Sequence, residues 1–227
     1  EIIDVRSPAE FAEDHIPGAI NCPVLDNEQR IQIGTLYKQV SPFDAKKLGA
    51  AMVSENIARH LRERFLDRPK RWKPLIYCWR GGNRSGAMTT IFRAIGWPAG
   101  QLEGGYKTWR SHVVTRLQSL PPQFRFMVIA GATGSAKTRI LQAIGERGEQ
   151  VLDLETLASH KGSVLGILPG QPQPTQKWFE TTVLSALERF DPDRPVYVEA
   201  ESRKIGNLHV PEMLIESIRR GACLNVD

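Results

Sequence analysis

The sequence predicts two successive α/β domains, each with a parallel sheet covered by helices. Short apolar segments alternate with helical patterns over residues 1–120, and two prolines, Pro121 and Pro122, then interrupt the chain. After them a glycine-rich turn joins an apolar strand to a helix, and a second alternating pattern begins. A chain of 227 residues accommodates two small domains. We therefore expect domains over residues 1–120 and 121–227.

The first domain opens with a strand–helix–strand pattern. Residues 2–5 are β-branched and apolar except for Asp4, which predicts a strand, and Ser7 can cap a helix over residues 8–14. A second short strand is expected at residues 19–21. Residues 26–51 show a less regular pattern, and we expect an insertion that lies over the sheet.

The rest of the first domain repeats the alternation. Helical periodicity predicts a helix over residues 54–66, and the apolar run at residues 75–78 predicts a buried strand. A helix over residues 85–95 follows. Residues 102–105 read as a strand end and a turn, and a helix is expected from residue 106 to about residue 117.

The second domain is expected to continue in the same manner, with a strand, a glycine-rich turn and a helix at its start. Apolar runs predict the strands and longer amphipathic stretches predict the helices. The expected strands are residues 126–130, 151–153 and 195–199, and the expected helices are residues 137–146, 176–189 and 211–219.

Cys78 is the most informative residue, because it ends a strand just before a Gly-Gly turn and a helix that Ser85 can cap. Such a turn surrounds a thiol with backbone N–H groups at a helix N-terminus, and Arg80 and Arg84 add positive charge. Each effect favours the thiolate, which is the nucleophile, and the cradle would also hold a persulfide or perselenide. The expected catalytic residues are Cys78, Arg80 and Arg84, and the expected anion loop comprises Trp79, Gly81, Gly82, Asn83 and Ser85. The alternative is an inert cysteine that ends a core strand.

A second motif, Gly131-Ala132-Thr133-Gly134-Ser135-Ala136-Lys137-Thr138, follows a strand and opens a helix, as a phosphate-binding P-loop does. Its backbone N–H groups would wrap a phosphate, Lys137 would reach the outer oxygens, and the Thr138 hydroxyl would hold Mg²⁺. Ala136 stands where glycine normally precedes the lysine, and its methyl group costs about 1 kcal/mol if that position requires a positive φ. We expect an anion site, leave nucleotide binding open, and retain as the alternative a turn without a ligand. The expected phosphate-binding residues are Gly131, Thr133, Gly134, Ser135, Ala136, Lys137 and Thr138.

Charged residues at strand ends extend this second site. Glu199 and Glu201 end the strand at residues 195–199, where a carboxylate would meet a P-loop metal. Asp153 ends the preceding strand. Basic and hydroxyl side chains that could clamp a diphosphate follow Glu201, namely Ser202, Arg203 and Lys204.

The net charge of +5 is concentrated in residues 1–120, which hold 18 Lys/Arg and 12 Asp/Glu, against 12 and 13 in the remainder. Many of these cations fall between residues 59 and 73, with Trp72 among them. A basic cluster with an aromatic residue suits a phosphate backbone, so we expect nucleic-acid contact there. The alternative is a solvated helix face followed by a polar loop. The candidate residues are Arg59, Arg62, Arg68, Lys70, Arg71 and Lys73.

The cysteines and the apolar stretches indicate in which cellular compartment the protein is expected. Cys22, Cys78 and Cys223 are widely spaced, unlike a disulfide framework or a zinc site, and a reducing cytoplasm is expected. The longest apolar stretches are far shorter than a membrane span, so we expect no membrane association. The chain starts inside an expected strand and ends at Asp227, just after Leu224-Asn225-Val226, without a helix or strand stop signal, and we expect both ends to be cuts in a longer protein.

Four segments of the first half resemble a rhodanese domain. They are residues 4–11, residues 15–21, the Cys78 loop and residues 102–106. Arg84 follows Cys78 by six positions, similar to sulfur-handling rhodaneses, whereas phosphatase relatives have a loop one residue longer. A loop of this size suits a single chalcogen atom.

The whole chain closely resembles the bacterial tRNA 2-selenouridine synthases, in which a rhodanese domain is joined to a P-loop domain. The matching segments are residues 37–43, 78–82, 151–155, 162–166 and 198–206, together with the P-loop. The resemblance implies a rhodanese-like parallel-sheet domain followed by a P-loop NTPase-like α/β domain. The family usually has a further C-terminal region.

The resemblance also implies a transferase that acts on the 2-position of the wobble uridine of tRNA. In that family 2-thiouridine is geranylated from geranyl diphosphate, and selenium from selenophosphate then replaces the S-geranyl group. Cys78 matches the essential rhodanese cysteine. The implied partners are tRNA, these two phosphate-bearing substrates and a selenophosphate-producing enzyme. Ala136 motivates the hypothesis that the P-loop serves geranyl diphosphate instead of a nucleotide, and both ligands stay open at this point.

Two other functions stay open at this point. One is a rhodanese-type sulfurtransferase with a nucleotide-binding regulatory domain, which would release sulfide or sulfite without tRNA. The other is a non-catalytic chalcogen carrier and tRNA-binding module, in which the P-loop half is only structural.

Overall fold

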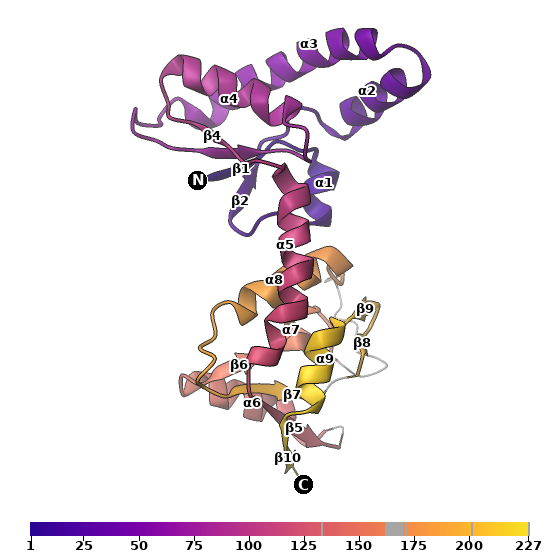
Figure 1. Ribbon diagram of the computed structural model, residues 1–227, viewed down its shortest axis with the longest axis vertical. Helices are drawn as coiled ribbons and strands as arrows, with labels where there is room; N and C mark the ends of the chain where they lie inside the picture. Colours follow the sequence, from indigo (N-terminus) through magenta and orange to yellow (C-terminus); the bar gives the residue numbers. More distant parts are fainter. Residues whose placement is uncertain (133, 162–169, 171, 201, 227) are drawn as a thin grey trace. The chain divides into compact units, whose positions relative to one another are not determined.

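The structure is a computed structural model that describes residues 1–132, 134–161, 170, 172–200 and 202–226 (Figure 1). The predicted α/β fold class with parallel sheets is confirmed. Contacts divide the chain into two units, Glu1–Arg110 and Ser111–Asp227, and the division falls inside helix α5 (Gly105–Ser119). The expected domain boundary between residues 120 and 121 stays a prediction.

The first unit is built on a four-stranded parallel sheet with the strand order β2-β1-β3-β4. Ile3 at the centre of β1 pairs with Ile20 on one side and Ile76 on the other, and both Ile3 and Ile76 are fully buried. Helix α4 packs on this sheet through Met88 and Phe92, which face the same core. The strands are β1 (Ile2–Asp4), β2 (Ala19–Asn21), β3 (Leu75–Tyr77) and β4 (Gly100–Gln101). The helices are α1 (Pro8–Glu13), α2 (Asn27–Gln39), α3 (Pro42–His60), the π-helical segment η1 (Leu61–Phe65), α4 (Asn83–Ile95) and the start of α5.

The expected irregular insertion at residues 26–51 is wrong, because this stretch forms the helix α2 and the first half of α3. Asp26 and Gln29 make a capping box that starts α2, and Ser41 caps α3 with Pro42 in its first turn. The helix expected to begin at residue 54 therefore begins at Pro42. The apolar pattern missed α2 because none of its residues is buried, so the helix has no apolar stripe to recognise. It lies beside α3 in a helical hairpin (Figure 1).

A buried charge pair ties the first strand to α5. The Arg6 guanidinium is hydrogen-bonded to Asp4, 2.6 Å from the nearer carboxylate oxygen, and it donates to the Asp14 carbonyl. It also lies 3.9 Å from the centre of the Tyr106 ring, whose hydroxyl donates to Asp14. Because Arg6 and Asp4 are almost fully buried, removing either one would leave an uncompensated charge in the core. The start of α5 is thereby held against β1.

The second unit has a parallel sheet of order β10-β5-β7-β6 and a small hairpin formed by β8 and β9. Its strands are β5 (Phe126–Gly131), β6 (Gln150–Leu152), β7 (Val196–Glu199), β8 (Lys204–Ile205), β9 (Leu208–His209) and β10 (Ala222–Val226). Its helical segments are η2 (Pro121–Gln123), α6 (Lys137–Glu146), α7 (Leu154–Leu157), α8 (Gln176–Leu187) and α9 (Glu212–Arg219). The expected strands and helices of this half are found to within two residues, and helix α6 has the predicted bounds.

Strand β10 was not expected. It pairs in parallel with β5, so that Leu224 lies beside Ile129. Its first four residues are exposed because it is an edge strand, and an exposed strand carries no apolar alternation to recognise. Among the described residues, no helix is long and apolar enough to cross a membrane.

Candidate functional sites: the Cys78 loop and the P-loop

Cys78 follows β3 directly, and its side chain is only 4% exposed. The Ser85 hydroxyl lies 3.3 Å from the Cys78 Sγ and can donate to it, while Gln101 donates to the Ser85 oxygen at 2.9 Å. The prediction that Ser85 caps α4 is wrong, because the helix begins two residues earlier, at Asn83, after Gly82 at φ +78°. Ser85 is therefore a partner of the thiol and not a helix cap.

The backbone of the Cys78 loop is held by the N-terminus of α5. The amides of Tyr106 and Lys107 donate to the Cys78 and Trp79 carbonyls at 2.8 and 2.9 Å. A trans peptide directs its N–H opposite to its C=O, so the amides that follow these carbonyls point away from α5. Gly105 makes the approach possible, because its φ is +57° and a Cβ there would lie 2.4 Å from the Cys78 carbonyl oxygen.

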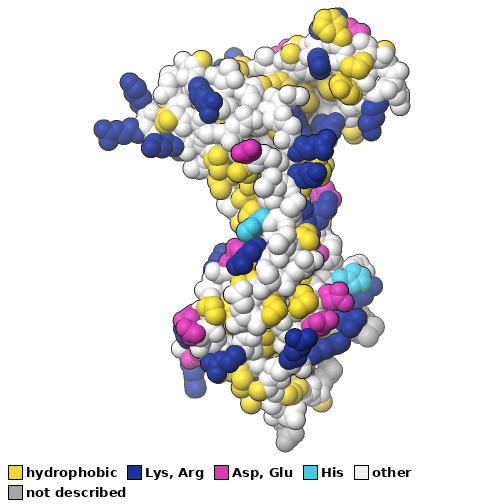
Figure 2. Space-filling model, in the orientation of Figure 1, with side chains coloured by type: hydrophobic (Ala, Val, Ile, Leu, Met, Phe, Trp, Pro, Cys, Tyr) yellow, Lys and Arg dark blue, Asp and Glu magenta, His cyan; other side chains and the backbone are white. Residues whose placement is uncertain are grey.

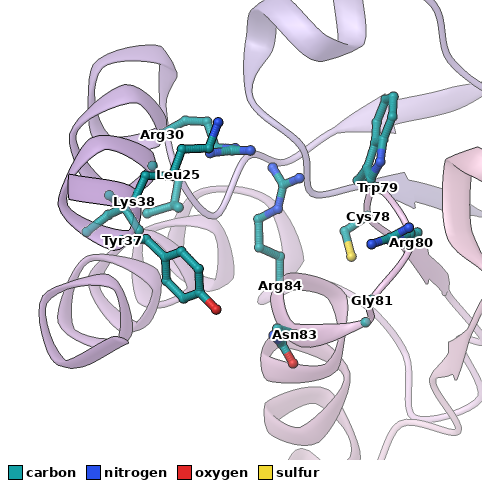
Figure 3. A pocket seen from close by; sticks show the side chains of 13 residues that line it. Leu25, Arg30, Tyr37, Lys38, Cys78, Trp79, Arg80, Gly81, Asn83 and Arg84 are labelled. Carbon is teal, nitrogen blue, oxygen red and sulfur yellow. The ribbon is translucent and has the colours of Figure 1, made fainter. Parts of the chain in front are cut away.

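The two arginines of the loop have different surroundings. Arg84 makes a two-pronged ion pair with Glu10, at 2.6 and 3.1 Å, and in Figure 3 its side chain extends toward Arg30 instead of the sulfur. Burial would raise the pKa of Glu10, but hydrogen bonding to Arg84 and the Arg84 charge outweigh it and lower this pKa to about 2. Arg80 is exposed, and no ion pair joins it to a described residue.

The other cysteine of the first unit, Cys22, lies in the core. Burial raises the pKa of its thiol to about 11, although Arg64 at 3.9 Å opposes this shift. Cys22 is therefore a neutral thiol with no exposed surface, whereas Cys78 opens onto a cavity. The structure thus separates the two cysteines of this unit, which the sequence alone does not.

A cavity of about 360 Å³ lies between the Cys78 loop and helix α2. Figure 3 shows Tyr37 and Lys38 of α2 across the cavity from Cys78 and Asn83. The sequence did not predict this wall, because α2 has no apolar periodicity; only the family-matching segment at residues 37–43 overlaps it. The cavity is lined by Leu25, Arg30, Ile33, Gly34, Tyr37, Lys38 and the loop residues 78–84. Its lining therefore includes four cationic side chains and no carboxylate.

The P-loop motif joins β5 to α6, as expected. Gly131 must be glycine here, because a Cβ would lie 2.6 Å from both the Ser135 Oγ and the Val226 carbonyl oxygen. Ala136 has φ +62°, so the steric cost expected of its methyl group is present. The Lys137 Nζ donates to the Gly131 and Ala132 carbonyls at 3.0 Å each. The predicted residue Thr133 lies outside the described residues.

Carboxylates from neighbouring strand ends gather beside Thr138. Burial raises the pKa of Glu199, the charges of Glu155 and Asp153 add to that effect, and a hydrogen bond with Thr138 opposes it. Asp153 also caps α7 by accepting from the Thr156 amide at 2.8 Å. The structure thus brings Thr138, Asp153 and Glu199 together, while Glu201 lies outside the described residues.

This donor set can be compared with the needs of Mg²⁺. No group of three or more His, Cys, Asp or Glu side chains among the described residues could hold a metal by itself. Mg²⁺ is commonly bound by one or two carboxylates and by substrate phosphates, so Glu199 and the Thr138 hydroxyl fit such a site.

Comparisons with known proteins agree with both halves of this arrangement. Residues 1–112 match the family described as rhodanese-like domain, and residues 124–227 match the family described as tRNA 2-selenouridine synthase AAA domain. A tRNA 2-selenouridine synthase of Nitrosomonas europaea is 36% identical over 230 residues, covering 100% of this chain and 59% of the relative. The enzyme of that name from Bdellovibrio bacteriovorus is 32% identical over 238 residues, covering 100% and 60%.

The chain belongs to the tRNA 2-selenouridine synthase family. It spans about 59% of the length of the first curated relatives it matches. A solved N-terminal domain of a putative ATP/GTP binding protein from Clostridium difficile is 37% identical, covering 49% of this chain and 87% of that chain with a TM-score of 0.43. A rhodanese-related protein from Thermoplasma volcanium is 22% identical over 49% of this chain and 76% of its own, with a TM-score of 0.31.

Within this member of the family, the predicted diphosphate clamp lies on the β8–β9 hairpin. The Ser202 hydroxyl is hydrogen-bonded to the Lys204 carbonyl, and the side chains of Arg203 and Lys204 are exposed. Gln173 anchors the hairpin through the Ile205 carbonyl at 3.0 Å. Among the described residues, no hydrogen bond or ion pair joins the clamp residues to the P-loop. The family segment at residues 162–166 lies outside the described residues.

The predicted tRNA-binding cations are mostly exposed. Arg68 is the exception, because it lies 3.3 Å from Glu1 and is half-buried. Figure 2 shows groups of Lys and Arg side chains on the visible face of the first unit. The exposed candidates are Arg59, Arg62, Lys70, Arg71 and Lys73.

Trp72 does not serve this basic cluster as an aromatic platform, contrary to the sequence interpretation. Its ring packs against Phe65, Phe92 and Trp97, with centroid separations of 5.1, 5.7 and 5.0 Å. Its Nε1 donates to Glu1. A ring that fills the core is not free to stack on a base, so Trp72 is structural.

Proposed function

We propose that the protein is a tRNA-modifying transferase that converts wobble 2-thiouridine to 2-selenouridine through an S-geranyl intermediate. The observation that carries this proposal is the presence in one chain of a cysteine loop, in which Arg84 follows Cys78 by six positions, and a phosphate-loop motif whose lysine follows alanine. Relatives that match the whole chain are called tRNA 2-selenouridine synthases, which supports the same function.

Cys78 acts in the selenium-transfer step. Its Sγ lies 3.3 Å from the Ser85 hydroxyl, at one end of a cavity whose charged lining side chains, among the described residues, are all cationic, and this suits the anionic selenophosphate. The selenium of selenophosphate is a soft nucleophile that forms a bond to the electrophilic C2 carbon of the S-geranylated base, while the C2–S bond breaks and geranyl thiol leaves. Water then cleaves the P–Se bond and releases phosphate, which leaves selenium on C2.

The P-loop half serves the geranylation step by holding the diphosphate of geranyl diphosphate. Prenylation of a sulfur needs a diphosphate cradle and no nucleotide hydrolysis. The backbone of residues 131, 132 and 134–138 provides the cradle, and Lys137 can leave its carbonyl partners for the outer oxygens. When bound beside Thr138 and Glu199, Mg²⁺ would neutralise charge on the departing diphosphate.

Mass analysis of tRNA nucleosides tests the proposal. The cells compared carry either the wild-type enzyme or Cys78→Ala as their sole 2-selenouridine synthase. We expect 2-selenouridine to disappear and S-geranyl-2-thiouridine to accumulate in the variant, since only selenium transfer requires the thiol. Unchanged 2-selenouridine would refute the assignment of Cys78.

Titration with geranyl diphosphate, ATP and GTP tests the second half. We expect binding of geranyl diphosphate that weakens in Lys137→Ala. Tight nucleotide binding without geranyl diphosphate binding would contradict the proposal. It would favour instead a rhodanese-type sulfurtransferase with a regulatory nucleotide domain, a reading supported by the rhodanese match.

Cells that carry the Lys137→Ala variant distinguish a non-catalytic carrier from the proposed enzyme. A purely structural P-loop half predicts an unchanged level of S-geranyl-2-thiouridine and 2-selenouridine. We expect both to fall.

A further inference from the structure

We propose that helix α2 is an RNA-binding element that receives an unstacked pyrimidine at the Cys78 cavity. Tyr37 stacks on the base, and Arg30 and Lys38 hold the flanking phosphates. This inference rests on the proposed function, because it names how the substrate of the Cys78 loop is bound.

The position of α2 carries the first step. Leu25 and α2 form the wall of the cavity opposite the Cys78 loop (Figure 3). A second cavity of about 520 Å³ shares Arg30, Gly34 and Lys38 with the first and extends along the same helix. The helix therefore borders one space large enough for a base near Cys78 and adjacent space for neighbouring nucleotides.

The charge of this wall fits a phosphate backbone. Glu10 already neutralises Arg84, but Arg30, Lys38 and Arg80 are exposed around the cavities. Glu10, half-buried in its pair with Arg84, is the one carboxylate that lines either cavity. An RNA loop presents phosphates on both sides of an extruded base, so cations on α2 and on the Cys78 loop can each meet one.

Among the described residues, no hydrogen bond or ring contact involves the Tyr37 side chain. Its side chain is 51% exposed, and none of the residues of α2 is buried. Unpaired RNA bases are recognised by stacking on such aromatic rings, because every base has a π-face. Trp72, the aromatic residue that the sequence suggested for this role, is taken up by the core.

Gly34 points to the same use of the helix. Glycine inside a helix makes the helix less stable than alanine does. Gly34 nevertheless lies in the middle of α2, on the wall of both cavities. A Cβ at this position would approach the Arg30 Nη1 to 3.0 Å, and apart from the backbone of α2 itself no other atom of the described residues would lie within 4 Å. The absent side chain thus leaves the space open and gives Arg30 room.

Binding of a tRNA anticodon stem-loop provides the direct test, with a fully paired RNA duplex of the same length for comparison. We expect Tyr37→Ala to weaken binding of the stem-loop roughly 5- to 150-fold, the range for one stacked base, and to leave duplex binding much less affected. Tyr37→Phe keeps the ring and should bind like the wild type. Phe43→Ala is the matched control, because Phe43 is an exposed aromatic residue of the same hairpin that lines neither cavity.

Gly34→Leu gives a second variant whose fold should survive. Leucine is the better helix former and its side chain would enter the open space, so we expect an equal or higher melting temperature together with weaker stem-loop binding. Stem-loop binding by both Tyr37→Ala and Gly34→Leu at the wild-type level would overturn the inference. So would equal losses in Tyr37→Ala and Phe43→Ala.

Turnover on intact tRNA separates this inference from the proposed function. A wild-type enzyme that binds the stem-loop through Tyr37 but never alters its uridine would refute the proposed reaction and support the binding element. If the wild-type enzyme makes 2-selenouridine and the Tyr37→Ala variant has the same KM for tRNA as the wild type, the binding element alone is refuted. We expect KM to rise in that variant by more than kcat falls.

Discussion

At the scale of single residues, the chemistry of the Cys78 loop depends on the partners that its polar side chains already have. Ser85 lies against the sulfur, whereas Arg84 is engaged by Glu10. Arg80 is the exposed cation of the loop. An incoming anion at Cys78 can therefore recruit Arg80 without breaking an ion pair, while recruiting Arg84 would cost the pair with Glu10.

The Glu10–Arg84 pair should make stability depend on pH in acid. The folded-state pKa of Glu10 is about 2, below its ordinary value of 4.5, so its contribution is complete above pH 4.5 and is lost as the pH falls toward 2. We expect Glu10→Gln to lower the free energy of unfolding at neutral pH by up to about 3 kcal/mol. In urea titrations, the difference in unfolding free energy between the variant and the wild type should become smaller as the pH falls from 4.5 to 2.

Glu103→Gln is the control for that series, because Glu103 is exposed. It should change stability little at any pH. If the difference in unfolding free energy between the wild type and Glu10→Gln stays constant from pH 7 to pH 2, the ion pair is not the cause of that difference.

The left-handed conformation of Ala136 should make it a destabilising residue. At φ +62° the methyl group is strained, so we expect Ala136→Gly to raise the free energy of unfolding by roughly 0.5–1 kcal/mol. Ala132→Gly, in the same loop but without a positive φ, should lower it. Chemical unfolding of the two variants measures the difference, and the same sign for both would contradict the strain.

At the scale of elements, the backbone of the Cys78 loop is held by α5, the helix that follows β4. The first amides of α5 need partners, and the Cys78 and Trp79 carbonyls supply them. The loop and α5 therefore stabilise each other, and the buried Arg6 beneath Tyr106 holds the start of α5 in place. Local stability at this contact determines the geometry around the thiol.

Gly105→Ala tests this contact. The new Cβ would lie 2.4 Å from the Cys78 carbonyl oxygen, so the loop must move, and we expect a loss of unfolding free energy beyond the roughly 1 kcal/mol of a positive φ. Gly18→Ala is the matched control, because Gly18 has φ +79° with nothing within 4 Å. Urea unfolding should show a clearly larger loss at residue 105. Equal losses would argue that contact with the loop is unimportant.

At the scale of the whole molecule, charge is the property that differs most along the chain. Residues 1–120 hold an excess of six cations, from 18 Lys/Arg and 12 Asp/Glu, while the remainder is nearly balanced. The first half is therefore expected to supply most of the electrostatic attraction for tRNA, and this attraction is sensitive to salt.

Replacing Lys70 and Arg71 together by alanine should weaken tRNA binding and reduce its salt dependence. Each lost phosphate contact lowers the slope of log K against log salt by roughly 0.7–0.9, so a change of about 1.5 is expected. Arg147→Ala, which removes an exposed cation of the second unit, is the comparison. A slope that is the same in all three proteins would exclude residues 70 and 71 from the tRNA contact.

The sequence by itself determined the features that depend on neighbouring residues. The cap at Ser7, the strand before Cys78 and the bounds of α6 were all predicted, because capping, apolar runs and glycine turns act over a few residues. The strained position at Ala136 could be anticipated for the same reason, since a P-loop imposes its backbone locally.

Only the tertiary structure decided which distant residues meet. The pair of Glu10 with Arg84, the packing of Trp72 on Trp97 and the α2 wall opposite Cys78 join segments separated by dozens of residues. The local sequence around Arg84 does not indicate whether its side chain contacts a thiol or a carboxylate. Its partner is set by the fold, which places Glu10 of α1 beside Arg84 at the start of α4.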